Sequence, residues 1–370
     1  GVILTGAING NGGSDTIDLR AYTSPLTFTL NGSSGSLSAA TGGYSNIEAL
    51  NRGSAGNTFS ITGNTGISLT GGAGADDYVF TNNAVLTGSI NGLGGNDTLD
   101  VSDASNTNPV SVTLTSAGAN GYSGSFAAGA GLYQPVTGGF SNMDTLTAGT
   151  GSDSLTGLAT AGTWGLDGSP TYTDGSAHVL NFSGFDTLNA GAGGDTFDVN
   201  TNTTANLNGG SGADSFVFTD GVILTGAING NGGSDTIDLS AYSTATDVVL
   251  TGSSANGLSG TDGGITGGFS NIDTVTGSSS AANSLTGENA TNAWAITGNN
   301  SGTLNDGTAS LTWSNFGSLV GGTGADTFTF TDAKSLSGSL NGTSGSDAIN
   351  YAAYSTATDV VLTGSSANGL

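Results

Sequence analysis

Hydrophobic and polar residues alternate along this chain in very short runs, and each run follows a Gly-rich turn. Asp214 is followed by Phe216 and Phe218. Asp235 is followed at the same two intervals by Ile237 and Leu239. Such alternation predicts short strands with one buried face, and no 3.6-residue apolar pattern of helical length accompanies it. We therefore expect an all-β chain in which Phe216 and Ile237 are buried and their neighbours are more exposed.

The acid that precedes each run recurs about once every 20 residues. Asp195, Asp214 and Asp235 are 19 and 21 residues apart. A shorter interval of nine residues separates Asp144 from Asp153, so two nonapeptides make one step. This periodicity predicts a parallel, right-handed β-solenoid, a β-roll or β-helix, with coils of about 18–21 residues. The acids should form a ladder along one edge, and the apolar residues should stack inside.

A longer period divides the chain into modules. Gly1–Leu19 is identical to Gly221–Leu239, and Ala241–Leu258 returns at Ala353–Leu370. We expect one continuous solenoid whose second module is the longest, with extra coils or loops, and which belongs to something longer. The predicted modules are residues 1–80, 81–218, 219–330 and 331–370. Loops that leave the solenoid are expected at the prolines, which fit the coil period poorly: Pro25, Pro109, Pro135 and Pro170.

Charge and composition exclude several functions. The chain has 28 acids against three bases and a net charge of −25, which disfavours nucleic acid and anionic lipid and favours cations. It has no cysteine, so disulfides, thiol catalysis and Cys-ligated zinc are excluded. No apolar run is long enough to cross a bilayer, so membrane insertion is not expected.

The Gly-rich turns resemble a known calcium-binding repeat. Gly209–Phe216 fits the pattern G-G-x-G-x-D-x-U-x of the repeats-in-toxin (RTX) family, as do Gly71–Tyr78 and Gly321–Phe328. The resemblance implies a β-roll that binds Ca²⁺ in its turns, where glycine permits positive φ and carboxylate and carbonyl oxygens suit calcium. The implied metal ligands, from full and partial matches, are Asp15, Asp76, Asp97, Asp153, Asp195, Asp214, Asp235, Asp326 and Asp347.

The chain also departs from that family. The acid is missing at Asn57, Asn283 and Gly317, whereas the family runs its motifs in unbroken tandem. The alternative is a plain β-solenoid in which Asp and Asn side chains cap turns by hydrogen bonds.

Residues for catalysis are scarce, so we do not expect an enzyme. His178 is the only histidine and is expected to be a surface or packing residue. The tryptophans occur in similar repeat phrases, which favours packing over sugar stacking: Trp164, Trp294 and Trp313.

Three functions remain open. The preferred one is a structural repeat protein of the bacterial surface or extracellular space, such as an adhesin stalk, a matrix fibre or a sheath-like filament, stiffened by calcium. It would self-associate and could contact cell surfaces or polysaccharide. The alternatives are a carbohydrate-binding or carbohydrate-acting β-helix, and a calcium-binding secretion or anchoring module of a larger exoprotein.

Overall fold

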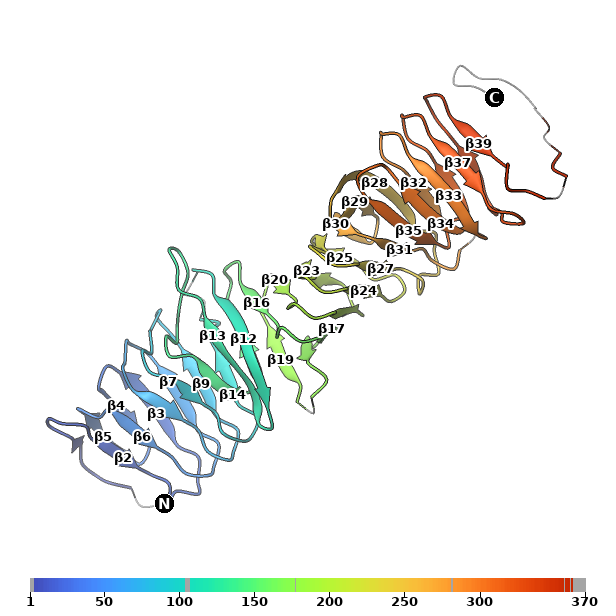
Figure 1. The fold of residues 1–370 in the computed structure, drawn as a ribbon. Helices are drawn as coiled ribbons and strands as arrows, with labels where there is room; N and C mark the ends of the chain where they lie inside the picture. The colour runs from blue at the N-terminus through green and yellow to red at the C-terminus, as the bar shows by residue number, and fades with distance from the viewer. Residues whose placement is uncertain are drawn as a thin grey trace. The chain divides into compact units, whose positions relative to one another are not determined.

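The computed structural model describes residues 3–103, 107–176, 178–280, 282–355, 357–359 and 361. All regular elements in these ranges are β-strands, which confirms the expected all-β solenoid. The chain divides into two compact units, each described by itself (Figure 1). Unit 1 comprises Gly1–Trp164 with Ser169–Asn189, and unit 2 comprises Gly165–Gly168 with Ala190–Leu370. The strand β17 (Thr163–Leu166) contributes residues to both.

Apart from the antiparallel strands described below, each coil of unit 1 contributes one strand to each of two sheets. In sheet A, β7, β9 and β11 pair in parallel, and they begin 19 and 21 residues apart at Thr58, Asp77 and Thr98. The strands of sheet A here are β1 (Ile8–Asn9), β3 (Thr27–Asn31), β4 (Ser34–Leu37), β5 (Ala40–Ser45), β7 (Thr58–Ile61), β9 (Asp77–Phe80), β11 (Thr98–Asp100), β15 (Thr145–Thr147), β18 (Thr171–Thr173) and β19 (Leu180–Ser183). Those of sheet B are β2 (Thr16–Asp18), β6 (Ala49–Asn51), β8 (Ser68–Thr70), β10 (Ile90–Asn91), β12 (Ser111–Gly118), β13 (Gly121–Phe126), β14 (Phe140–Met143), β16 (Ser154–Thr156) and β20 (Thr187–Asn189).

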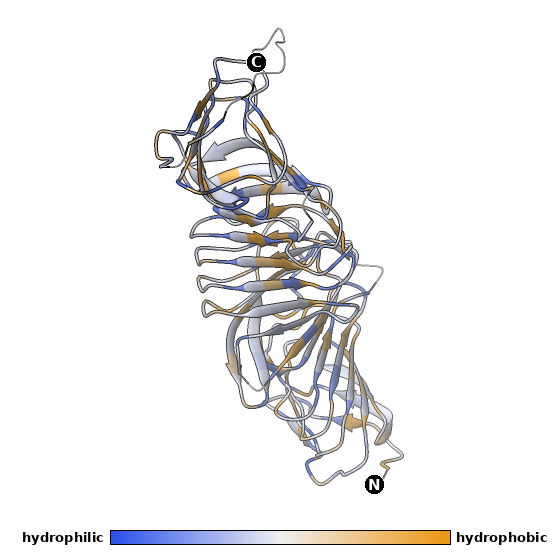
Figure 2. Ribbon diagram, turned by 90° about the vertical axis from the view of Figure 1, so that its right-hand side faces the viewer, coloured by the Kyte–Doolittle hydropathy of each residue, from blue (hydrophilic) through white to orange (hydrophobic). Residues whose placement is uncertain are grey.

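Unit 2 has the same two sheets, and two of its coils contribute two short strands each to sheet B. Sheet A contains β21 (Thr196–Val199), β24 (Ser215–Phe218), β27 (Thr236–Asp238), β31 (Thr274–Thr276), β33 (Ala293–Gly298), β34 (Ser301–Asn305), β35 (Ser310–Ser314), β37 (Thr327–Phe330) and β39 (Ala348–Asn350). Sheet B contains β22 (Thr203–Thr204), β23 (Asn206–Asn208), β25 (Leu224–Thr225), β26 (Ile228–Asn229), β28 (Asp247–Ser254), β29 (Gly257–Asp262), β30 (Ile265–Ile272), β32 (Ser284–Thr286), β36 (Ser318–Val320) and β38 (Leu340–Asn341). Figure 2 shows these strands as successive rungs.

The interior consists of apolar residues stacked in register. Phe216 and Ile237 are direct partners in parallel strands and are 0% and 1% exposed, as the sequence predicted. The Phe197 and Phe216 rings lie 5.2 Å apart at an interplanar angle of 7°. Burying one such ring contributes about 2–3 kcal/mol, so the repeated apolar position is the main source of stability.

Antiparallel triples interrupt the parallel coils. In each, three consecutive strands pair antiparallel before the next coil begins: β3–β4–β5, β12–β13–β14, β28–β29–β30 and β33–β34–β35. The strands β18 and β19 pair in the same sense. Pro25 and Pro109 each precede a triple by two residues, and Pro170 precedes β18. The segments at Pro25, Pro109 and Pro170 therefore lead directly into strands and are not loops, whereas Pro135 lies in the connection between β13 and β14, as the loop prediction expected.

The triples of unit 2 alternate between the two sheets. β28–β29–β30 adds two strands to sheet B, between β26 and β32. β33–β34–β35 then adds two strands to sheet A, between β31 and β37. Each sheet has therefore gained two strands by β36 and β37, so the two stacks are again of equal height.

Each triple ends in one short phrase, an aromatic residue, serine, and then a residue with positive φ. That third residue is Asn46, Asn142, Asn271 or Asn315, with φ between 52° and 66°. Glycine takes the same place after β19, where Gly184 has φ 80°. Asparagine tolerates this left-handed conformation, which turns the chain from one sheet to the other.

Candidate functional site

The acidic residues of the repeat form a ladder of hydrogen bonds between neighbouring coils. In unit 2, the backbone N–H of Asp214 donates to Oδ1 of Asp235 at 2.9 Å, and that of Asp235 donates to Oδ2 of Asp273 at 2.9 Å. The N–H of Asp195 likewise donates to Oδ1 of Asp214 at 2.7 Å. Each carboxylate thus caps a main-chain donor at the start of the adjacent strand, where that donor would otherwise be buried unpaired.

Unit 1 contains an equivalent ladder. The N–H of Asn57 donates to Asp76 Oδ1 at 2.7 Å, and that of Asp76 donates to Asp97 Oδ1 at 2.8 Å. The N–H of Asp97 in turn donates to Asp144 Oδ2 at 2.9 Å. An amide can also cap a main-chain donor in this ladder, because Oδ1 of Asn57 accepts the N–H of Leu26 at 3.2 Å.

The glycines of the motif make room for this arrangement. A Cβ atom on Gly209 would lie 2.4 Å from Oδ2 of Asp214, five residues later in the same turn. A Cβ atom on Gly212 would lie 1.8 Å from the carbonyl oxygen of Gly193 in the neighbouring coil. The first glycine is therefore fixed by the carboxylate and the third by close backbone approach.

The structure divides the nine predicted residues between two edges. Seven precede strands of sheet A: Asp76, Asp97, Asp195, Asp214, Asp235, Asp326 and Asp347. Asp15 and Asp153 precede strands of sheet B. The N–H of Asp15 donates to Glu48 at 2.8 Å and that of Asp153 donates to Asp186 at 3.0 Å.

The prediction omitted the acids that follow the antiparallel strands. Glu48, Asp144, Asp186 and Asp273 each accept the N–H of an Asp that lies 33 to 47 residues earlier. They join the coil before the antiparallel strands to the coil after them. Their signal in the sequence is the phrase of aromatic residue, serine, asparagine or glycine, and apolar residue that precedes each of them.

Burial perturbs the ladder carboxyls. Asp97, Asp214 and Asp235 are at most 1% exposed, and their Oδ2 atoms accept no hydrogen bond. Burial, with smaller contributions from neighbouring carboxylates, raises the pKa of Asp97 and of Asp235 to about 7 and that of Asp214 to about 6. Asp97 and Asp235 are therefore partly protonated at neutral pH, and Asp214 is mostly ionised.

Unit 1 carries one buried cation beside its ladder. Arg52 takes the place, five residues before Asn57, that Gly71 takes before Asp76. Its guanidinium lies 3.7 Å from the centroid of the Phe59 ring and donates to the carbonyl oxygen of Thr70. Burial lowers the pKa of Arg52 to about 10, so it stays charged at neutral pH and partly offsets the rise in the pKa of Asp76 that burial causes.

The ladder geometry does not fit a calcium shell as arranged. Calcium takes six to eight oxygen ligands at 2.3–2.6 Å. Here one oxygen of each ladder carboxylate already accepts a backbone N–H, and successive carboxylates cap successive coils without converging. Across the described ranges, no group of three or more His, Cys, Asp or Glu side chains is placed to hold a metal. Calcium binding therefore remains a prediction from the sequence motif.

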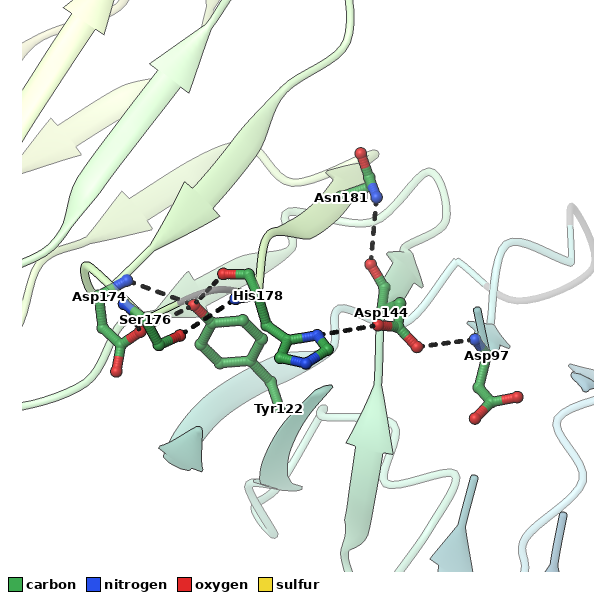
Figure 3. Close-up of polar contacts among 7 residues, drawn as sticks. All are labelled: Asp97, Tyr122, Asp144, Asp174, Ser176, His178 and Asn181. Atoms are coloured by element: carbon green, nitrogen blue, oxygen red, sulfur yellow. Dashed lines mark hydrogen bonds and ion pairs between the residues drawn. The ribbon is translucent and has the colours of Figure 1, made fainter. Parts of the chain in front are cut away.

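His178 lies at one end of the unit 1 ladder (Figure 3). Its Nδ1 lies 3.8 Å from Oδ1 of Asp144, whose other oxygen accepts the N–H of Asp97. The buried hydroxyl of Tyr122 lies 3.2 Å from both Asp174 Oδ1 and the His178 carbonyl oxygen. These contacts hold the loop between β18 and β19 against β13, which is a packing role for the histidine.

The tryptophans are packing residues, as expected. Trp164, Trp294 and Trp313 are at most 1% exposed, so none presents a ring to a sugar. The rings of Trp294 and Phe328 stack with centroids 5.6 Å apart.

Comparison with known proteins gives no family for this chain. No family model matches it, and no curated protein matches its sequence. Among the residues that the structure describes, there is no helix with the length and apolarity to cross a membrane.

Proposed function

We propose that this chain is a load-bearing segment of a bacterial surface or extracellular structural protein, such as a stalk, fibre or sheath-like filament. One observation supports this most directly: the side-chain caps on main-chain donors are repeated from coil to coil in both units. The caps also bridge the antiparallel triples, as between Asp235 and Asp273. Separating two coils would break strand pairing and side-chain caps together.

The composition supports the same proposal. Nearly identical segments recur at long intervals, such as Gly1–Leu19 and Gly221–Leu239. A load-bearing repeat gains from being copied, whereas a catalytic site is needed once. The net charge of −25 with three bases leaves few partners for an anionic polysaccharide or a nucleic acid.

Mechanical unfolding tests the proposal. The chain would be held between handles at its ends and pulled, with the unfolding force recorded for wild type, Asp214→Ala and Asp77→Ala. Asp214 caps a buried N–H, whereas Asp77 is exposed on β9, so only Asp214→Ala should lower the unfolding force. Equal forces for all three chains would remove the main support for a load-bearing ladder.

Self-association and location are parts of the same proposal. We expect end-to-end or lateral assembly, measured by sedimentation velocity and electron microscopy, and surface labelling of intact bacteria by antibodies against the chain. Compact monomers that turn over a polysaccharide would favour the carbohydrate-acting alternative instead.

A further inference from the structure

Two modules of the chain can be compared position by position around one antiparallel triple. Leu114 pairs with Gly124 in unit 1, as Leu250 pairs with Gly260 in unit 2. Two positions beyond the glycine, Phe126 in unit 1 corresponds to Asp262 in unit 2. A buried aromatic residue in one copy is thus replaced by an acid in the other.

The surroundings differ as well. In unit 1, Phe126 is 4% exposed and packs against Phe140 with ring centroids 5.8 Å apart. Residues 127–135 then follow, and their Tyr133 donates to the carbonyl oxygen of Ala84 at 2.5 Å. Tyr242 makes the corresponding bond to Val222 in unit 2, so this tyrosine contact is shared and the inserted residues differ. In unit 2 only Gly263 and Gly264 stand between β29 and β30.

Unit 2 has an open cavity of about 310 Å³ where Asp262 replaces this bulk, next to β25, β28 and β29. Its walls include Val222, Ile223 and the ring of Tyr242, whose hydroxyl donates to the carbonyl oxygen of Val222. Two carboxylates, Asp262 and Asp247, also line it.

The two carboxylates are held in place. Asp262 is 9% exposed, and its Oδ1 accepts the N–H of Gly264 at 2.8 Å. Oδ1 of Asp247 accepts the hydroxyl of Ser284 at 2.6 Å. Neither Arg nor Lys lines the cavity. A largely buried carboxylate therefore lies at the cavity together with an exposed one, and no basic side chain lines the cavity, so its charge favours a cationic ligand.

We propose that this cavity binds an alkylammonium group, with the ammonium at Asp262 and Asp247 and the alkyl chain against Val222, Ile223 and Tyr242. Charge complementarity selects the cation, and the apolar walls select an aliphatic chain over a hydrated metal ion. Burial, with the neighbouring charge of Asp247, raises the pKa of Asp262, and a bound ammonium would counter both effects.

The test measures binding of n-butylammonium chloride to the whole chain by calorimetry and by shifts of methyl resonances, with sodium chloride at equal ionic strength as reference. A ligand of this size is expected to bind with Kd on the order of 1 mM. Asp262→Asn removes the charge and should weaken binding at least tenfold. Asp262→Phe places the residue of the other copy in the cavity and should abolish binding.

Matched controls separate this site from general attraction to an acidic protein. Asp77→Asn removes one exposed charge in unit 1 and should leave binding unchanged. The uncharged analogue n-butanol should bind at least tenfold more weakly than the amine. Nα-acetyl-lysine amide distinguishes a lysine side chain from a free amine as the natural source. Binding of both with similar Kd supports a peptide ligand, and binding of the amine alone supports a small amine.

Three results would overturn the proposal. They are equal binding by wild type and Asp262→Asn, equal binding of butanol and butylammonium, and no saturable binding of the amine to folded wild type. Circular dichroism of each variant establishes that it is folded, and Asp262→Asn keeps the test valid should Asp262→Phe not fold.

Discussion

Replacing Asp235 by asparagine tests whether the ionised ladder carboxylates destabilise the folded chain and whether protonation removes this effect. Oδ1 of Asp235 caps the N–H of Asp214, and Oδ2 is buried without a hydrogen-bond partner. An asparagine keeps the acceptor and replaces the unpartnered oxygen by a donor. A Cβ atom on Gly230 would lie 2.1 Å from the carbonyl oxygen of Asn271 and 2.4 Å from Oδ2 of Asp235, so an acceptor lies near the oxygen that the amide nitrogen would replace.

Natural precedents for this substitution occur in the chain. Asn292 occupies the equivalent position before β33, and its Nδ2 donates to the carbonyl oxygen of Gly321 at 2.9 Å. Asn283, before β32, caps the N–H of Thr246 at 3.0 Å while its Nδ2 donates to Ser278 O at 2.7 Å. Asn292 thus shows that the amide donor finds a partner before a strand of sheet A, although its Oδ1 accepts no hydrogen bond, and Asn283 shows the complete cap before a strand of sheet B.

The magnitude follows from the pKa. Burial raises the pKa of Asp235 from 3.8 to about 7. At 1.36 kcal/mol per unit, full ionisation above pH 8 costs at most about 4 kcal/mol. Because solvent near the surface turn screens part of the charge, we take about 1–2 kcal/mol. The folded pKa exceeds the unfolded one, so this contribution to stability is complete below about pH 4 and is lost as the pH rises through about 7.

We therefore expect Asp235→Asn to raise the free energy of unfolding by about 1–2 kcal/mol at pH 8 and to change it little at pH 4. Asp235→Ala removes the acceptor of a buried N–H and should cost about 1–3 kcal/mol at pH 4. Urea denaturation in EDTA, followed by fluorescence of the buried Trp294 and Trp313 of unit 2, measures these differences.

Two outcomes would refute the reasoning. One is a loss of stability on Asp235→Asn at pH 8, and the other is a wild-type stability that increases between pH 5 and pH 8. Either would mean that the ionised carboxylate is favoured in the folded state. If this reversal occurs only with calcium present, calcium is the source of that preference.

Three further predictions concern other features. Addition of EDTA separates the two interpretations of the ladder: calcium bound as the motif predicts requires a lower melting temperature in EDTA, and an unchanged one would leave backbone capping as the role of the ladder carboxylates. Tyr242→Phe should destabilise unit 2 by about 1 kcal/mol in urea denaturation, since the hydroxyl bond to Val222 O is lost; no change would mean that water replaces it. Asn142→Ala should be about 1 kcal/mol less stable than Asn142→Gly, since both lose the side chain and only glycine adopts φ 56° freely; equal stabilities would contradict the strain argument.

The periodic part of the fold could be predicted from the sequence. The phase of Asp214 and Phe216 against Asp235 and Ile237 indicates parallel strands in register, and the structure confirms the pairing. The same spacing predicts that the acids of neighbouring coils lie next to one another. Their hydrogen-bonding role was only one of two interpretations, because a calcium site and a backbone cap both require glycine followed by aspartate.

The antiparallel triples were not predicted, because alternation does not reveal strand direction. A reversal is indicated only by its turn, and Asn-Gly is the strongest short hairpin signal. That dipeptide occurs at Asn120-Gly121 and Asn256-Gly257, between the paired strands β12 and β13 and between β28 and β29. It also follows the parallel strands β23 and β26, at Asn208-Gly209 and Asn229-Gly230, so it does not distinguish the reversals from the parallel coils. The cavity at Asp262 depends on a length difference between two copies, which becomes clear only when their strand pairing is known.

The alternation of triples between sheets in unit 2 limits how such genes can change in length. A deletion confined to the triple β28–β29–β30 would leave sheet B two strands short of sheet A, an offset of about 10 Å along the stack. Loss of both triples together would cancel the offset. Viable length variants should therefore gain or lose these insertions in pairs, so that the spacing of recombination points in the gene follows the geometry of the two sheets.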